Sequence, residues 1–160
     1  MPEITLATRK NYDFLANLQP NDWADIFASM ERGERDLYIL HENDEIYGYV
    51  TLNFNPKYAL YSRLNIPEIQ DLFIAPNHRR KGYGDLLVNH CEKTAALRGA
   101  TQIGISVSVS PAFAVAQYMY IARGYNVDGN GVTYDRMPVV HGQSYKVDDD
   151  LCLMMLKDLN

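Results

Sequence analysis

A short basic turn between an apolar strand and a helix carries the residues of this sequence best suited to chemistry. Residues 79–81 read Arg-Arg-Lys and follow an apolar segment at 72–74 with four residues in between. Gly82 and Gly84 follow, and because they lack a Cβ they let an anion approach the backbone. A helix that begins here leaves its first N–H groups unpaired at an electropositive end. The segment therefore predicts a diphosphate-binding turn, the alternative being a basic turn that only caps a helix.

The glycine spacing separates this turn from two common phosphate motifs. A Walker loop needs a Gly-Lys-Ser/Thr end and a dinucleotide fingerprint needs G-x-G-x-x-G, and the segment has neither. Arg79-x-x-Gly82-x-Gly84, preceded by an apolar strand and Pro76, instead resembles the acetyl-CoA signature Q/R-x-x-G-x-G/A of the GNAT superfamily of N-acetyltransferases. A second block, Ala116 to Tyr125, is similar to the other GNAT hallmark, A-x-x-L/M-Y-x-x-x-G-F/Y.

The resemblance identifies the chain as a small single-domain GNAT protein of the bacterial type, with one domain over residues 1–160. It implies an α/β (α+β) fold: a central mixed, mostly antiparallel sheet of six to seven strands flanked by about four helices. The strands would splay apart at the acetyl-CoA site. The resemblance also implies acetyl-CoA as co-substrate and no metal. The residues implied to bind it are Leu72, Phe73, Ile74, Arg79, Arg80, Lys81, Gly82, Tyr83, Gly84 and Tyr120.

Two side chains are the implied catalysts. Tyr120 matches the family tyrosine that protonates the departing CoA sulfur, and a phenol is a competent donor at neutral pH. Glu68 matches the position of a glutamate base in several members, although a strand-entry surface charge is an equal alternative. Gln70 cannot take a proton, and Asp71 would need a bulge to reach the same face. The alternative to Glu68 as the base is a water relay that involves Asp71 or loop tyrosines.

The remaining patterns predict the elements that position these residues. Alternation predicts strands at 3–9, 36–41, 45–54 and 103–109, with Gly48 marking a bulge in the second hairpin strand. Helical spacing predicts helices at 11–18, 23–30, 83–97 and 111–123. Residues 128–147 read as turn-rich with a short strand at 132–134, and residues 151–156 as a buried final strand. Residues 55–67 read as a connecting loop. The candidate acceptor-binding residues are Trp23, Phe27, Tyr58 and Tyr61, although Trp23 and Phe27 fit packing on the sheet as well.

Composition narrows the class of protein. A net charge of −5 and a pI near 5.3 argue against nucleic-acid binding, which needs a basic face. No apolar run is long enough to span a membrane and the N-terminus starts no signal peptide, so a cytoplasmic protein is expected. Cys91 and Cys152 lack metal-ligand spacing and read as buried thiols. We therefore expect an acetyl-CoA-dependent N-acetyltransferase acting on a small-molecule or peptide amine, by default a homodimer. The alternative is a catalytically silent acyl-CoA sensor.

Overall fold

The computed structural model describes residues 1–160, which form eight strands and five α helices. Contacts divide the chain into two compact units, Met1–Asn55 with Ile69–Thr94, and Pro56–Glu68 with Ala95–Asn160. Helices and strands are interspersed along the chain, and both units contain antiparallel strand pairs. The expected mixed α/β class is confirmed. The two-residue strand β7 (Met137–Pro138) and the six-residue helix α3 (Ala59–Leu64) add to the predicted elements.

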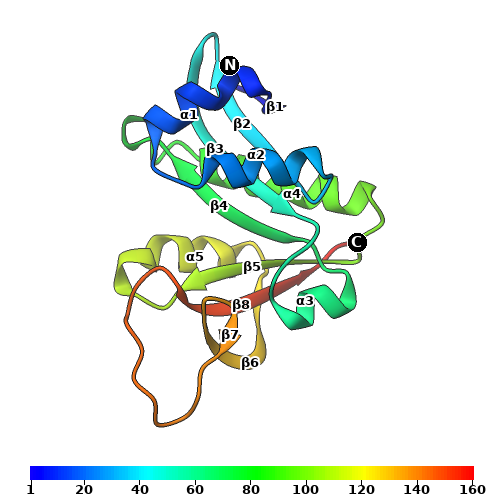
Figure 1. Ribbon diagram of the computed structural model, residues 1–160, viewed down its shortest axis with the longest axis vertical. Coiled ribbons are helices and arrows are strands. Elements are labelled where there is room, and N and C mark those ends of the chain that lie inside the picture. The colour runs from blue at the N-terminus through cyan, green and yellow to red at the C-terminus, as the bar shows by residue number, and fades with distance from the viewer. The chain divides into compact units, whose positions relative to one another are not determined.

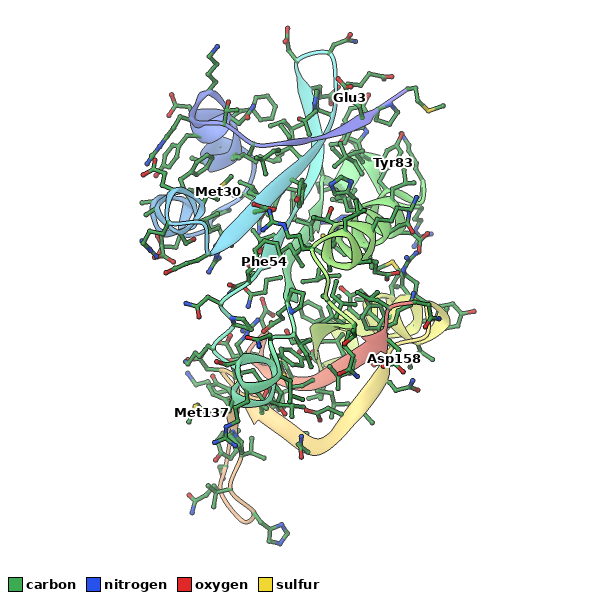
Figure 2. All side chains as sticks on the ribbon, turned by 90° about the vertical axis from the view of Figure 1, so that its right-hand side faces the viewer. Glu3, Met30, Phe54, Tyr83, Met137 and Asp158 are labelled. Carbon is green, nitrogen blue, oxygen red and sulfur yellow. The ribbon has the colours of Figure 1, made fainter.

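The first unit is a layer of strands with helices on both faces. Its strands follow the order β1 (Glu3–Leu6), β2 (Arg35–Glu42), β3 (Glu45–Asn53) and β4 (Glu68–Ile74), the last beginning at the unit boundary. Its helices are α1 (Tyr12–Leu18), α2 (Trp23–Glu31) and α4 (Tyr83–Leu97), with 3-10 turns at Arg9–Asn11 and Pro76–His78. Helices α1 and α2 lie on one face of the strands and α4 on the other, as the labels Met30 and Tyr83 show in Figure 2.

The core of this unit follows from the apolar stripe of α2. Asp22 caps the helix by accepting a hydrogen bond from the Asp25 N–H at 3.2 Å. Trp23, Ile26 and Phe27 are then buried against the strands. The stripe that predicted this helix is therefore the stripe that joins it to the sheet.

Gly48 marks the bulge that its position predicts. The register of β2 and β3 shifts there, because Leu40 pairs with Gly48 whereas His41 pairs with Ile46. A Cβ at Gly48 would stand 2.5 Å from the carbonyl O of Phe73 and 2.6 Å from Cδ1 of Ile74. Glycine is therefore required where β3 approaches the C-terminal end of β4.

The second unit also contains a layer of antiparallel strands. Its strands follow the order β5 (Gln102–Ser108), β8 (Leu151–Asp158), β6 (Asn126–Tyr134) and β7 (Met137–Pro138). Its helices are α3 (Ala59–Leu64) and α5 (Ala114–Ala122), the latter preceded by a 3-10 turn at Pro111–Phe113. Helix α3 lies on one face of these strands and α5 on the other (Figure 2), and the segment between β7 and β8 forms the long loop drawn in orange in Figure 1.

Two expectations for this unit are wrong. Residues 55–67 are not only a loop, because α3 forms there and ends at Asn65, which adopts the left-handed conformation of a helix C-cap. Strand β6 is longer than the predicted 132–134 segment, and its register shifts between Val127 and Val132 across two glycines with positive φ. No helix combines the length and hydropathy needed to cross a bilayer. Both cysteines are buried free thiols, as expected.

Candidate functional site

The basic turn is open to solvent at the start of α4. Arg79, Arg80, Lys81 and Gly82 are all exposed. Arg80 and Gly82 have φ angles of 62° and 81°, so the backbone turns sharply through the left-handed region. A Cβ at Gly82 would meet no atom within 4 Å, which leaves space against the backbone. The first helical bond here runs from the Leu86 N–H to the Gly82 carbonyl, at 3.1 Å, so the preceding amides form an electropositive end suited to an anion.

Arg79 anchors this turn to strand β4. Its Nε donates to the carbonyl of Ile74 at 2.8 Å, and its guanidinium lies 5.7 Å from the centre of the Phe73 ring. The side chain therefore folds back over the strand end. Arg80 and Lys81 are the cations of the turn that no such contact ties to the strand.

An aromatic stack holds both ends of the turn. Tyr47 stacks on His78 with ring centres 3.7 Å apart and on Tyr83 at 5.7 Å. Its hydroxyl donates to Glu42 at 2.8 Å, a bond that raises the pKa of Tyr47 to about 12. His78 in turn lies 2.9 Å from Glu45. The sequence reasoning missed Tyr47, whose only local signal is its position beside Gly48.

Strand β4 is irregular at Asp71. This residue has a φ of 54° within the strand and is exposed, whereas Leu72 to Ile74 are all half-buried, which is the broken alternation of a bulge. Thr51 Oγ1 donates to the Gln70 carbonyl at 3.1 Å and lies 3.3 Å from Asp71 Oδ2. Asp71 thus points to solvent beside a hydroxyl on β3.

Trp23 and Phe27 belong to the core of the first unit. Each side chain is 3% exposed, and Trp23 packs edge-on against Tyr49 with centres 4.9 Å apart. The indole Nε1 donates to the Gln19 carbonyl at 2.9 Å. These contacts are those of packing residues, and a role of either side chain in acceptor binding stays a prediction.

Glu68 is buried in the second unit and paired with an arginine. Its carboxylate is 0% exposed, and Oε2 accepts from Arg136 at 2.7 Å from Nη2 and 3.2 Å from Nε. Its other oxygen, Oε1, is buried and accepts no hydrogen bond from the chain. The interpretation of Glu68 as a surface charge is therefore wrong. Arg136 was not among the predicted site residues, because it lies 68 positions away on the β6–β7 turn.

Tyr58 and Tyr61 pack together on α3 and its approach. Tyr61 is completely buried, and its hydroxyl donates to the Met155 carbonyl at 2.6 Å. Its ring fills the place of a side chain at Gly104, where a Cβ would lie 2.4 Å from Cζ. Tyr58 donates to Asp128 and meets Tyr61 edge-on at 4.8 Å. Both tyrosines lie in the same unit as Glu68, and their contact with an acceptor stays a prediction.

Tyr120 occupies α5 on its buried side. It is 5% exposed and packs edge-on against Tyr125 with ring centres 6.1 Å apart. Burial raises the pKa of Tyr120 to about 12, so the phenol stays protonated at neutral pH. A phenol that stays protonated in this way can donate a hydrogen bond to a departing thiolate and act as its general acid.

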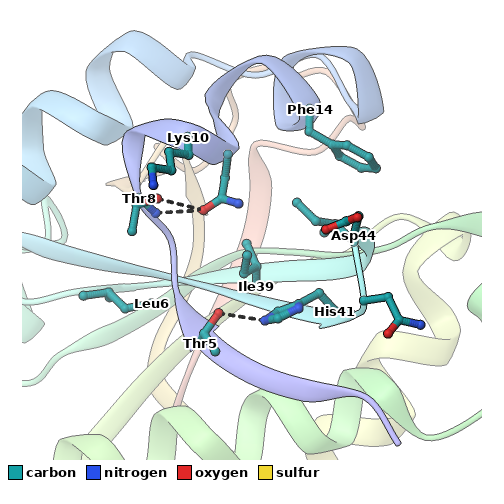
Figure 3. A pocket seen from close by; sticks show the side chains of 11 residues that line it. Thr5, Leu6, Thr8, Lys10, Phe14, Ile39, His41 and Asp44 are labelled. Atoms are coloured by element: carbon teal, nitrogen blue, oxygen red, sulfur yellow. Dashed lines mark hydrogen bonds between the residues drawn. The ribbon is translucent and has the colours of Figure 1, made fainter.

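A separate hollow of about 410 Å³ opens beside β1 and α1 (Figure 3), and none of the predicted site residues lines it. His41 Nε2 lies 2.9 Å from Thr5 Oγ1, and the Thr8 N–H donates to Asn11 at 2.8 Å. Much of its polar lining is thus engaged within the chain.

Comparison with known proteins assigns the family. A model of the acetyltransferase (GNAT) family matches residues 5–125, or 121 of the 160 residues. The chain belongs to this acetyltransferase (GNAT) family. Both hallmark blocks of the GNAT resemblance fall within the matched range, and the acyltransferase class is therefore established. A search of curated sequences finds no match.

Solved GNAT structures share the fold. The ribosomal-protein-S18-alanine N-acetyltransferase of Escherichia coli is 16% identical, with a TM-score of 0.72 and coverage of 99% of this chain and 94% of that one. The yncA protein of Salmonella typhimurium, with its cofactor acetyl-CoA, is 15% identical with a TM-score of 0.71, covering 100% and 95%. An acetyltransferase of Bacillus subtilis in complex with CoA is 19% identical with a TM-score of 0.70, covering 100% of both chains. At these identities the likeness establishes the GNAT fold.

Proposed function

We propose that this GNAT protein is an acetyl-CoA-dependent N-acetyltransferase that acetylates a primary amine of a small molecule or peptide. The observation that carries the proposal is the exposed Arg-Arg-Lys turn with Gly82 open to solvent at the start of α4. The Salmonella and Bacillus structures, which hold acetyl-CoA and CoA, support the co-substrate. The E. coli enzyme, whose acceptor is an alanine of a ribosomal protein, supports an amine acceptor.

The family resemblance assigns the binding roles. Residues 79–84 would hold the diphosphate, through the first amides of α4 and the charges of Arg80 and Lys81. Backbone groups of Leu72 and Ile74 would pair with the pantetheine arm, and the Leu72 N–H would donate to the thioester oxygen as it becomes an oxyanion. Phe73 lies within the first strand segment and Tyr83 within the turn, and the resemblance gives both a place in the cofactor site.

The chemistry requires three proton transfers around one acyl transfer. The acceptor is an ammonium at neutral pH, because the pKa of a free amine is roughly 10. Glu68 takes one proton from it through Oε1, directly or by a water, and the neutral amine then attacks the carbonyl carbon. The C–N bond forms, the C–S bond breaks, and Tyr120 protonates the departing thiolate. The nitrogen loses a second proton as the amide forms, and this proton restores the Tyr120 phenol. The proton taken by Glu68 is the one that leaves to solvent.

Asp71 is the second candidate for the base. The bulge exposes its carboxylate beside Thr51, whereas Glu68 is buried and paired. We keep Glu68 as the proposed base because its free Oε1 is a buried acceptor without a donor, which a bound amine or water would satisfy. If Glu68→Gln abolishes acetylation and Asp71→Asn does not change it, Glu68 is supported as the base. The reverse result would assign the base to Asp71.

A silent acyl-CoA sensor is the competing function. The test is thiol release from acetyl-CoA with a panel of polyamines, amino acids, aminoglycosides and peptides with free N-termini. An enzyme releases thiol only with an accepted amine and loses activity in Tyr120→Phe. If acetyl-CoA binds, no amine is acetylated and Tyr120→Phe changes nothing, the sensor function holds instead.

A further inference from the structure

The pairing of Glu68 with Arg136 is one-sided. Both Nη2 and Nε of Arg136 approach the same carboxylate oxygen, Oε2, at 2.7 and 3.2 Å. Oε1 accepts nothing from the chain although the carboxylate is 0% exposed. Arginine commonly binds a carboxylate through both oxygens. Here the contact through one oxygen holds the group in place and leaves the other available.

The arginine is held by a turn that its own sequence does not favour. Asp135 and Arg136 have φ angles of 47° and 64°, and both are non-glycine residues in the left-handed region. Such conformations cost free energy and persist only where other contacts enforce them. Lys57 binds Asp135 at 2.9 Å, and the Asp135 N–H donates to the Asp150 carbonyl at 3.0 Å. The turn therefore directs the guanidinium at Glu68 at the cost of local backbone strain.

Two titratable side chains that interact with Glu68, the Cys152 thiol and the Tyr61 phenol, are neutral. Burial raises the pKa of the Cys152 thiol on β8 to about 11, and burial with the nearby Glu68 charge raises the pKa of Tyr61 on α3 further still. From β5, Ser106 offers only its hydroxyl, at 3.4 Å from Arg136 Nη2. Among these neighbours Arg136 alone carries a charge, so it is the group that balances the buried carboxylate.

We propose that Arg136 is a positioning residue for the acetyl-transfer reaction: it places its positive charge beside Glu68 and fixes the carboxylate so that Oε1 receives the proton of the acceptor. This inference rests on the proposed function, in which Glu68 is the base. Arg136 touches no reacting atom in this scheme and acts through Glu68. If Arg136 served only to stabilise the fold, its replacement would lower the stability of the protein but would not change the pH dependence of catalysis.

The test compares Arg136→Gln with Arg136→Lys. Gln can still donate to Oε2 but removes the charge, whereas Lys keeps the charge without the planar fork. Lys57→Met is the matched control. It removes the ion pair with Asp135 and so loosens the same turn, but it leaves the positive charge of Arg136 beside Glu68. For each variant, kcat/KM for the acetylated amine is measured across pH, with circular dichroism at each pH to confirm folding and the KM for acetyl-CoA to confirm cofactor binding.

The proposal predicts a distinct result for each variant. In Arg136→Gln the acidic limb of the kcat/KM profile moves up by about one pH unit, so activity on that limb falls about tenfold. In Arg136→Lys the limb stays near its wild-type position while kcat falls, and in Lys57→Met the limb does not move. A folded Arg136→Gln protein whose acidic limb is unchanged overturns the role of Arg136 and leaves the proposed function standing. A wild-type protein that binds acetyl-CoA and acetylates no amine overturns the proposed function and this inference together.

Discussion

Reversing the charge of the basic turn is the sharpest perturbation of the proposed diphosphate site. The double variant Arg80→Glu with Lys81→Glu replaces two exposed cations by two anions and leaves Arg79 attached to Ile74. We expect the fold to survive, because neither side chain is buried. We expect CoA to bind far more weakly, because two attractions to phosphate become two repulsions.

The magnitude follows from ordinary exposed ion pairs. Each attraction lost and each repulsion gained at an exposed position is worth about 0.5–1 kcal/mol. Four such changes sum to about 2–4 kcal/mol, which corresponds to a roughly 30- to 900-fold rise in the Kd for CoA. The loss should shrink as salt is added, because the site is open to solvent and its charges are screened.

A matched control separates the site from the net charge. Lys10→Glu with Lys93→Glu also reverses two exposed lysines of the first unit, one of them farther along α4. Each reversal lowers the net charge by two, so both doubles change it from −5 to −9. Titration calorimetry with CoA at low and high salt should show weak binding in the turn variant only. Equal affinity of the two doubles, or wild-type affinity of the turn variant, would refute the reasoning.

Three further changes test the supporting structure. Tyr120→Phe should lower kcat about a hundredfold at unchanged KM for acetyl-CoA. Because burial raises the pKa of Tyr120 to about 12, the wild-type profile should show no loss from phenol ionisation below about pH 10; a Tyr120-dependent limb near pH 8 would contradict this. Tyr47→Ala removes the ring stacked on His78. The KM for acetyl-CoA should rise severalfold, by a larger factor than that by which kcat falls. An unchanged KM would show that the stack does not support the turn. Gly104→Ala should lower the free energy of unfolding by about 1–3 kcal/mol in urea titration, because the new methyl would stand 2.4 Å from the Tyr61 ring. In a Tyr61→Leu background the same substitution should cost less, and strictly additive losses would argue against the clash.

The strand, basic turn and helix from Glu68 to Leu97 could be predicted from the sequence because their signals are local. Alternation, a glycine pair and a helical stripe all fall within 30 residues, and β4 and α4 form there. The bulge at Gly48 is local in the same sense. The family match then confirmed the class of enzyme that these segments indicated.

The features that escaped prediction depend on distant partners. Helix α3 has only six residues, and Tyr61 is fixed by a hydrogen bond to Met155, 94 positions away. The β6–β7 turn carries Asp135 and Arg136 in left-handed conformations without the Asn-Gly or Asp-Gly signal of a tight hairpin. The partner of Glu68 could therefore not be predicted from the sequence, and neither could the burial of Glu68 itself.

If the acetyl group passes straight from the thioester to the amine, the protein never carries it, and mass spectrometry of a single turnover can follow this. Enzyme in excess over acetyl-CoA is mixed with an accepted amine, and acetylated amine, free CoA and intact protein are quantified at successive times. With direct transfer, acetylated amine and CoA appear together, in equal amounts, while the protein mass never gains an acetyl group. An acetylated protein that forms and decays before the product appears, or CoA released without acetylated amine, would contradict it.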